Sequence, residues 1–222
     1  MEADWWSLDW SFPNTRHVQR CLQRLLFIVM GSSAAVGRLH TLKATWLSAL
    51  TQQNLMIMSD RDHAATGERT TTRLAGQKGY ASAQRRQFEG LRLAYGERHG
   101  EGVPQWTVLV DDDTYVNVCH LCLYIERFDS SQRYLIGHVH NVLERRTLTG
   151  GAGMLLSRGA FLAFGEALQN GTLGLPPYGV GNDQHLVQNA AGLGVGIIHS
   201  NLLWPDAISA DARALWDAKF GK

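Results

Sequence analysis

The stretch of sequence that decides the fold is residues 106–116, which read Trp-Thr-Val-Leu-Val-Asp-Asp-Asp-Thr-Tyr-Val. Its apolar, β-branched beginning predicts a buried strand, and three carboxylates follow that strand directly. Because side chains alternate along an extended strand, Asp111 and Asp113 are expected on one side and Asp112 on the other. Two carboxylates on one side offer hard oxygen ligands to Mg²⁺ or Mn²⁺.

The same triplet has a simpler interpretation as a solvated turn after a core strand. The apolar pattern resumes at once, however, in residues 115–118, which read Tyr-Val-Asn-Val. This continuation argues against a merely exposed acidic tip. The sequence therefore favours a cation site at the end of this strand.

The composition allows one compact domain of 222 residues and excludes several classes of protein. With 21 Lys and Arg against 20 Asp and Glu, nothing indicates electrostatic binding of nucleic acid. Three cysteines argue against a disulfide-dense secreted scaffold and leave the compartment open. The first residues lack the pattern of a signal peptide, and the longest apolar run, residues 25–30, is too short to span a bilayer. We expect a soluble chain with no membrane span.

Strand-like apolar segments alternate with amphipathic segments along the chain, which predicts an α/β domain with a mostly parallel central sheet flanked by helices. The expected strands are residues 25–30, 54–60 and 134–137, together with the apolar run over residues 106–110 that precedes the acids. The expected helices are residues 36–50, 81–99 and 119–128. Residues 61–78 are polar and predict a long loop. The tryptophan-rich residues 4–13 are expected to form either a docked arm or a mobile tail.

Polar residues follow three of the expected strands. Gly31 and Ser32 follow the first, Asp60 ends the second, and the acidic triplet ends the third. In an open α/β sheet, ligands bind beyond the carboxyl ends of the strands, so these segments should meet at one edge. Gly31 and Ser32 would let a ligand approach the backbone closely, although any turn from strand to helix needs such small residues.

Four blocks in a fixed order give the chain a family resemblance. They are residues 29–46, which end in Leu-Lys-Ala-Thr-Trp; residues 111–116, Asp-Asp-Asp-Thr-Tyr-Val; residues 150–157, Gly-Gly-Ala-Gly-Met-Leu-Leu-Ser; and Asn182-Asp183 followed by Ile198-His199-Ser200. Together they resemble the fringe and core 1 β-1,3-galactosyltransferase family over about residues 25–204. The resemblance implies a single GT-A (Rossmann-like) catalytic domain, residues 21–222, after an N-terminal arm or tail of residues 1–20.

The resemblance also implies an activity. Proteins of this family are inverting glycosyltransferases that use a UDP-sugar donor and a divalent metal, commonly Mn²⁺. We expect transfer of a hexose or N-acetylhexosamine, with galactose or GlcNAc favoured, to a carbohydrate or glycoprotein acceptor through a β-1,3 linkage. Family members usually work in the Golgi lumen behind a membrane anchor, and this chain shows no such anchor.

The resemblance assigns the metal to Asp113 and His199, with Asp111 and Asp112 binding the donor. His199 ends an apolar run that would bring its imidazole beside the carboxylates, and imidazole suits Mn²⁺ better than Mg²⁺. An isolated histidine at a strand end more often has a hydrogen-bonded structural role. The metal would act as a Lewis acid on the departing diphosphate.

Inversion by a single displacement requires a base for the acceptor hydroxyl, and Asp183 matches the family's acidic position. Many members carry two adjacent acids there, whereas this chain has Asn182 and Asp183. Asp183 would then act alone. The structural alternative makes Asp183 the N-cap of a helix over residues 184–191, a common position for aspartate.

Further donor-site candidates come from the glycine block and from the first helix. Gly150 and Gly151 would bring the backbone close to the sugar or the acceptor, unless they form only a tight turn. Arg38 could face a diphosphate, although most helix arginines are merely solvated. Asp60 resembles family positions near the nucleotide base. Trp46 lies at a helical core spacing, so we interpret it as a packing residue.

Three other motifs receive no catalytic role. Cys119 and Cys122 have the spacing of a metal or redox pair, but they fall on an expected helix with no second pair nearby. His138 and His140 are interpreted as a surface pair. Residues 170–172, Asn-Gly-Thr, form an N-glycosylation sequon, which is informative only if the chain enters the secretory pathway.

Two rival functions stay open. One is a degenerate GT-A domain that binds nucleotide or glycan without turnover, which the missing second acid at Asn182 keeps open. The other is a phosphatase of the haloacid-dehalogenase type, in which an Asp-x-Asp motif also follows an apolar strand. That motif usually has Thr or Val two residues after its second Asp, where this chain has Tyr115.

Overall fold

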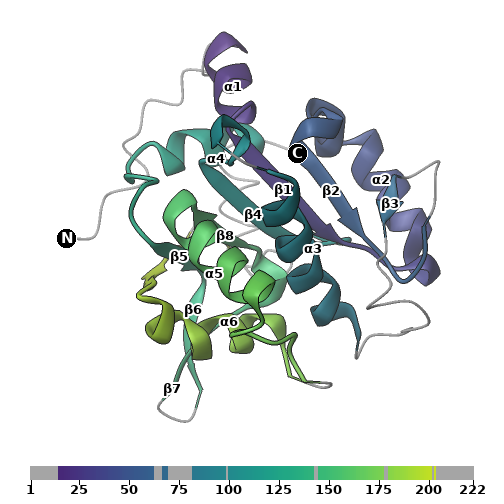
Figure 1. The fold of residues 1–222 in the computed structure, drawn as a ribbon. Helices are drawn as coiled ribbons and strands as arrows, with labels where there is room; N and C mark the ends of the chain where they lie inside the picture. Colours follow the sequence, from purple (N-terminus) through teal and green to yellow (C-terminus); the bar gives the residue numbers. More distant parts are fainter. Residues whose placement is uncertain are drawn as a thin grey trace.

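The computed structural model describes residues 15–62, 67–69, 82–98, 100–142, 145–177, 180–201 and 203. Its central feature is a seven-stranded sheet with the strand order β3-β2-β1-β4-β8-β5-β9 (Figure 1). The strands are β1 (Leu25–Met30), β2 (Leu55–Met58), β3 (Glu68–Arg69), β4 (Trp106–Asp111), β5 (Tyr134–Gly137), β8 (Met154–Ser157) and β9 (Gly196–His199). β8 runs antiparallel to both neighbours, and the other pairings are parallel. The mostly parallel α/β sheet predicted from the sequence is therefore confirmed.

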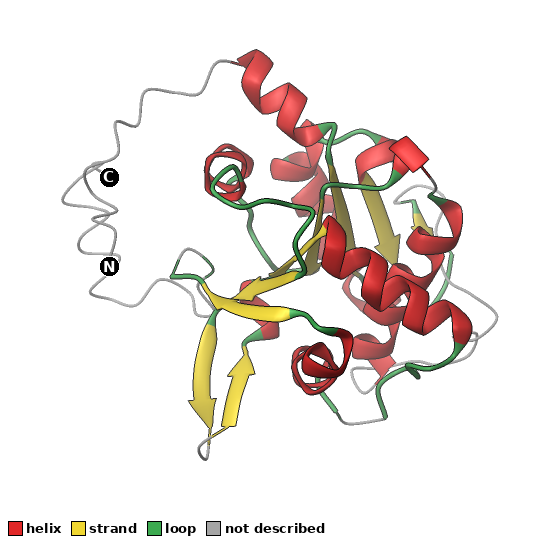
Figure 2. Ribbon diagram, turned by 60° about the vertical axis from the view of Figure 1, so that its left-hand side comes forward, coloured by secondary structure: helices red, strands yellow, loops and turns green. Residues whose placement is uncertain are grey.

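Six helices accompany the sheet. They are α1 (Thr15–Leu22), α2 (Val36–Ala44), α3 (Ala83–Glu97), α4 (Val118–Ile125), α5 (Arg158–Asn170) and α6 (Asn182–Ala190), all within the described part of the chain. A separate antiparallel hairpin, β6 (Val139–Val142) with β7 (Arg145–Leu148), projects away from the sheet (Figure 2). α6 packs against β7.

The strands alternate their side chains between two cores, which explains why β1 reads as a continuous apolar run. Leu26 and Ile28 of β1 enter a core that α3, α5 and α6 cover. Phe27 and Val29 enter the opposite core, which α1, α2 and α4 complete. Every residue of β1 is buried, so no polar position on this strand would be tolerated without a partner.

One expected helix ends earlier in the structure than the sequence predicted. The helix predicted over residues 36–50 stops at Ala44, and Trp46–Ala49 form a short 3₁₀ helix instead. The indole of Trp46 is the physical reason. Its ring packs on Phe27 with 5.4 Å between centroids, while its N–H donates to the carbonyl of Thr114 at 3.1 Å. These contacts hold Trp46 in the 3₁₀ helix that follows Thr45.

Part of the loop predicted over residues 61–78 lies outside the described residues. Within the described part, Glu68 and Arg69 form β3, which pairs with β2 at the edge of the sheet. The tryptophan-rich segment 4–13 also lies outside the described residues. Among the helices that the structure describes, none has the length and apolar character needed to cross a membrane.

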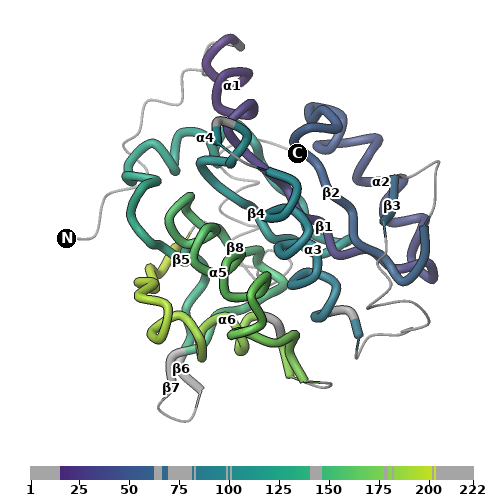
Figure 3. Tube along the Cα trace, viewed as in Figure 1, coloured from purple at the N-terminus to yellow at the C-terminus, as the bar shows by residue number. Residues whose placement is uncertain are grey.

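A disulfide joins Cys21 of α1 to Cys122 of α4, with the two Cα atoms 5.9 Å apart. Both half-cystines are buried, and 101 residues separate them in the sequence. Figure 3 shows α1 and α4 adjacent at the same end of the molecule. Since Cys122 is bonded to Cys21, the Cys119 and Cys122 thiols do not form a metal or redox pair.

Candidate active site

The carboxyl ends of β1, β2 and β4 meet at one edge of the sheet, as the sequence predicted. Met30, the last residue of β1, is in register with Met58 of β2 and with Asp111 of β4. The N–H of Gly31 donates to the carbonyl of Met58 at 2.7 Å, so the first turn begins as a continuation of the sheet. The candidate donor-site segments are therefore brought together.

Asp111 ends β4 with a partly buried carboxylate, one oxygen of which has no hydrogen-bond partner within the described structure. Burial raises the pKa of this carboxyl to about 7, and neighbouring negative charges add to the effect. These charges belong, in order of effect, to Asp113, Asp112 and Asp183. The site thus concentrates negative charge around a carboxyl group that has lost much of its solvent. A bound cation would relieve this repulsion.

Asp112 and Asp113 lie in the turn that follows β4, where the alternation of an extended strand no longer applies. The same guanidinium nitrogen of Arg38 lies 3.2 Å from Asp112 Oδ1 and 3.1 Å from Asp113 Oδ2. The prediction that Asp112 points away from Asp113 is therefore wrong, because the strand ends at Asp111. Burial raises the pKa of Asp112, and the Arg38 guanidinium opposes this shift.

Thr114 connects the acidic turn to the glycine block, a role that the sequence analysis missed. Its hydroxyl accepts from the N–H of Asp111 and donates to the carbonyl of Gly151, both at 3.3 Å. Its own carbonyl accepts from the Trp46 indole. The only signal in the sequence was the position of Thr114 directly after the acids. Gly153 closes the turn at φ +82°, which favours glycine.

Asp183 links the start of α6 to the same glycine block. Its Oδ2 accepts from the N–H of Gly150 at 3.0 Å, and its Oδ1 accepts from the N–H of Gln184 at 2.7 Å. The helix begins at Asn182 with Gly181 as its N-cap, so the prediction of Asp183 as the N-cap is wrong. Asp183 lies instead in the first helical turn, where a negative charge is also favourable.

Asp60 holds the turn after β1. Its two carboxylate oxygens accept from the N–H and the hydroxyl of Ser33, each at 2.7 Å. Burial alone would raise the pKa of Asp60, but the bonds from Ser33 outweigh it and hold this pKa below its ordinary value. Ser32 caps the following 3₁₀ turn by accepting from the N–H of Ala34 at 3.3 Å.

His199 ends β9, but its ring is engaged on both sides. Nδ1 accepts from the N–H of Val139 at 3.0 Å, and Nε2 bonds to the side chain of Asn201. The ring also packs edge-on against His138, with 5.3 Å between centroids. His138 and His140 are both partly exposed, and the latter bonds to a threonine hydroxyl.

A divalent cation fits the carboxylates of this site better than it fits His199. The unpartnered oxygen of Asp111 and the exposed carboxylate of Asp113 are oxygen donors in a strongly negative site. His199 in its observed orientation offers no nitrogen to a metal. Within the described ranges, no group of three or more His, Cys, Asp or Glu side chains could hold a metal ion by itself.

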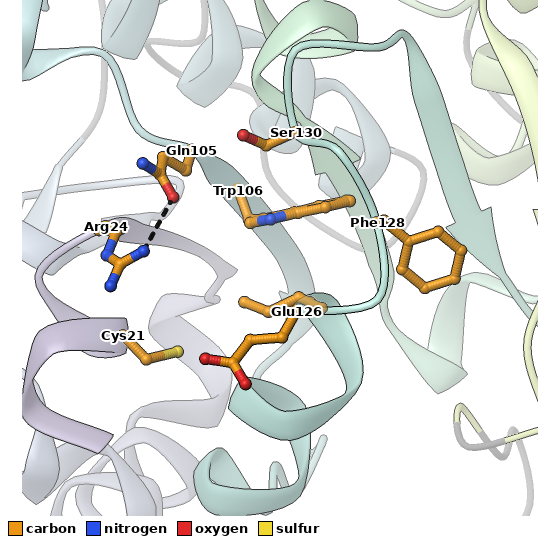
Figure 4. Close-up of a pocket in the computed structure, with 8 residues that line it drawn as sticks. Cys21, Arg24, Gln105, Trp106, Glu126, Phe128 and Ser130 are labelled. Carbon is orange, nitrogen blue, oxygen red and sulfur yellow. Dashed lines mark hydrogen bonds between the residues drawn. The ribbon is translucent and has the colours of Figure 1, made fainter. Parts of the chain in front are cut away.

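A hollow of about 200 Å³, shown in Figure 4, lies at the start of β4, whereas the acidic triplet follows the end of that strand. Trp106, the first residue of β4, lines it together with Cys21. Arg24 and Gln105 form its hydrogen-bonded rim, with 3.5 Å between their side-chain atoms. At roughly 3.3 Å per strand residue, the Cα of Trp106 is about 16 Å from that of Asp111.

The mostly parallel sheet and the polar groups at its carboxyl edge define a GT-A, Rossmann-like protein. The chain belongs to the Fringe-like family, whose model matches residues 32–181. The family implies a glycosyltransferase, with a sugar donor and a glycan acceptor. The matched range contains the acidic triplet and the glycine block, whereas Asp183 and His199 follow it. No curated protein matches the chain.

Proposed function

We propose that this protein is a metal-dependent inverting glycosyltransferase. It transfers a hexose or N-acetylhexosamine, with galactose or GlcNAc favoured, from a UDP-sugar to a hydroxyl of a carbohydrate or glycoprotein, forming a β-1,3 linkage. The observation that carries the proposal is the gathering of four carboxylates beside the glycine block, at the edge of the sheet where α/β proteins bind nucleotides. These are Asp111, Asp112, Asp113 and Asp183.

A diphosphate with a bound metal ion offers a cation and anionic oxygens. Asp113 is suited to bind the cation, and Arg38 is suited to bind the phosphate oxygens. Magnesium-like cations are commonly held by one or two carboxylates together with substrate phosphates, so a site with few protein donors is adequate. When bound, the cation supplies Lewis-acid stabilisation of the departing diphosphate. Arg38, whose guanidinium already lies at the acidic turn, binds the phosphate oxygens and keeps Asp112 and Asp113 in place.

For His199 to bind the metal, its imidazole ring must change orientation. A neutral imidazole has one acceptor nitrogen, and here the N–H of Val139 occupies it. We propose that donor binding turns the ring out of this contact and frees a nitrogen for the cation. His199→Ala should then weaken Mn²⁺ binding in the presence of UDP, and unchanged Mn²⁺ affinity would remove His199 from the metal site.

Asp183 is the proposed base. Its two backbone hydrogen bonds hold the carboxylate rigidly, while each oxygen keeps a further lone pair for the acceptor hydroxyl. Asp183 accepts the hydroxyl proton as the acceptor oxygen attacks the anomeric carbon. The contact with Gly150 makes the base and the glycine block one rigid unit, so the acceptor and the donor sugar are positioned together.

The direct test measures UDP release and sugar transfer with a panel of UDP-sugars and Mn²⁺. Asp183→Asn should suppress transfer by at least about 10²-fold, within the usual range for general-base removal, and leave UDP binding near normal. Glu166→Gln, an exposed acid on α5, is the matched control and should keep full activity.

Other results identify the rival functions. Metal-dependent UDP binding without UDP release from any donor would identify a degenerate GT-A domain. Release of phosphate from phosphomonoesters would identify a phosphatase. Loss of both UDP binding and transfer in Asp183→Asn would remove the case for Asp183 as the base.

A further inference from the structure

The sequon at residues 170–172 lies in an exposed turn at the end of α5. Asn170 is the last residue of the helix, and Gly171 follows it in the left-handed conformation with φ +80°. Asn170, Gly171 and Thr172 are all exposed. No other Asn-x-Ser/Thr tripeptide occurs in the sequence. The chain therefore offers one such acceptor, and it lies on the surface.

The side chains of Asn170 and Thr172 contact each other directly within the sequon. The Oδ1 atom of Asn170 accepts from the N–H of Thr172 at 2.9 Å and from its hydroxyl at 2.8 Å. A backbone N–H can only donate, so the carboxamide oxygen faces Thr172 and the Nδ2 amide faces away. Two donors on the oxygen polarise the carboxamide, and the Nδ2 group has no hydrogen-bond partner among the described residues.

The disulfide supplies independent information about the compartment. Cys21 and Cys122 are buried and bonded although 101 residues separate them. Such structural disulfides form and persist in oxidising compartments and are rare in the cytosol. The endoplasmic reticulum lumen is an oxidising compartment, and N-glycosylation of Asn-x-Thr sequons takes place there. The disulfide therefore supports passage of the chain through an oxidising compartment, where the sequon can be glycosylated.

We propose that Asn170 carries an N-linked glycan. The co-reactant is an oligosaccharide esterified to a lipid diphosphate, and a membrane oligosaccharyltransferase catalyses the step. The Nδ2 atom of Asn170 attacks the anomeric carbon, a C–N bond forms, and the bond between that carbon and the diphosphate oxygen breaks. The amide nitrogen loses one proton, and the lipid diphosphate leaves. This modification does not depend on the proposed transferase activity.

The test directs the full chain into the endoplasmic reticulum of a eukaryotic host and measures the mass of the secreted protein. The wild-type protein should show one discrete increase in mass that peptide-N-glycosidase removes. Asn170→Gln and Thr172→Ala should abolish the increase completely, whereas Thr172→Ser should retain part of it because serine keeps the hydroxyl.

Non-reducing electrophoresis of the same samples establishes that the disulfide has formed. A wild-type protein with an intact disulfide and no glycan would overturn the proposal. A mass increase that persists in Asn170→Gln would also overturn it. Thermal unfolding of Asn170→Gln provides the folding control, since loss of the local bonds to Thr172 at an exposed helix end should cost only about 1 kcal/mol.

Discussion

Replacing Asp111 with asparagine should stabilise the metal-free protein at neutral and alkaline pH. Burial, together with three neighbouring carboxylates, raises the pKa of Asp111 from 3.8 to about 7. The folded protein therefore binds a proton that the unfolded chain has already released between about pH 4 and pH 7. Asparagine has nearly the same shape and carries no charge at any pH, so it removes this penalty.

The magnitude follows from the two pKa values. The interval from 3.8 to about 7 corresponds to at most about 4 kcal/mol, since each pH unit contributes about 1.4 kcal/mol. Because the pKa of Asp111 is higher in the folded than in the unfolded protein, the folded protein keeps its full stability below about pH 4. It loses stability as the pH rises to about 7. Wild type and Asp111→Asn should thus be equally stable near pH 4, and the variant should be more stable above pH 7.

Denaturant unfolding without divalent cations, measured at intervals from pH 4 to pH 8.5, tests this reasoning. Glu166→Gln, an exposed acid on another helix, should follow the wild-type profile. Asp111→Asn should also lose transferase activity, because the charge that destabilises the fold is the charge that the function needs. Parallel profiles for wild type and Asp111→Asn would refute the assignment of a charge penalty to this carboxyl.

Three further predictions concern the framework of the site. Cys122→Ser removes the bond to Cys21 and should cost about 5 kcal/mol for a loop of about 100 residues, while Cys119→Ser should cost far less; similar denaturation midpoints for both would refute this. Asp60→Asn weakens two bonds to a charged acceptor and should cost about 1 kcal/mol at pH 7. Because the pKa of Asp60 is lowered in the folded protein, this difference should shrink as the pH falls below about 4, and a constant difference in a pH series would contradict it. Gly153→Ala should cost about 1 to 3 kcal/mol at φ +82°, with a Cβ atom 3.3 Å from a valine methyl, and an unchanged melting temperature would contradict this.

The sequence by itself determined the class of fold. Residues 25–30 read as a continuous apolar run, and residues 106–110 as a nearly continuous one, because each strand is buried on both faces. This local pattern needs no knowledge of the neighbours. The acids and small residues at the strand ends then predicted the ligand edge, since parallel strands bring their carboxyl ends together. The motif blocks predicted the family, which the Fringe-like match confirmed.

Only the tertiary structure decided how distant side chains pair. Periodicity describes residues within one element, so it could not predict that Arg38 would hold Asp112 and Asp113 together, or that Asp183 would bind Gly150. The expected geometry of the triplet assumed that side chains alternate along a strand as far as Asp113. β4 ends at Asp111, so this assumption did not hold. The disulfide between Cys21 and Cys122, which are 101 residues apart, could not be predicted for the same reason. It depends on how α1 and α4 pack together and not on either segment alone.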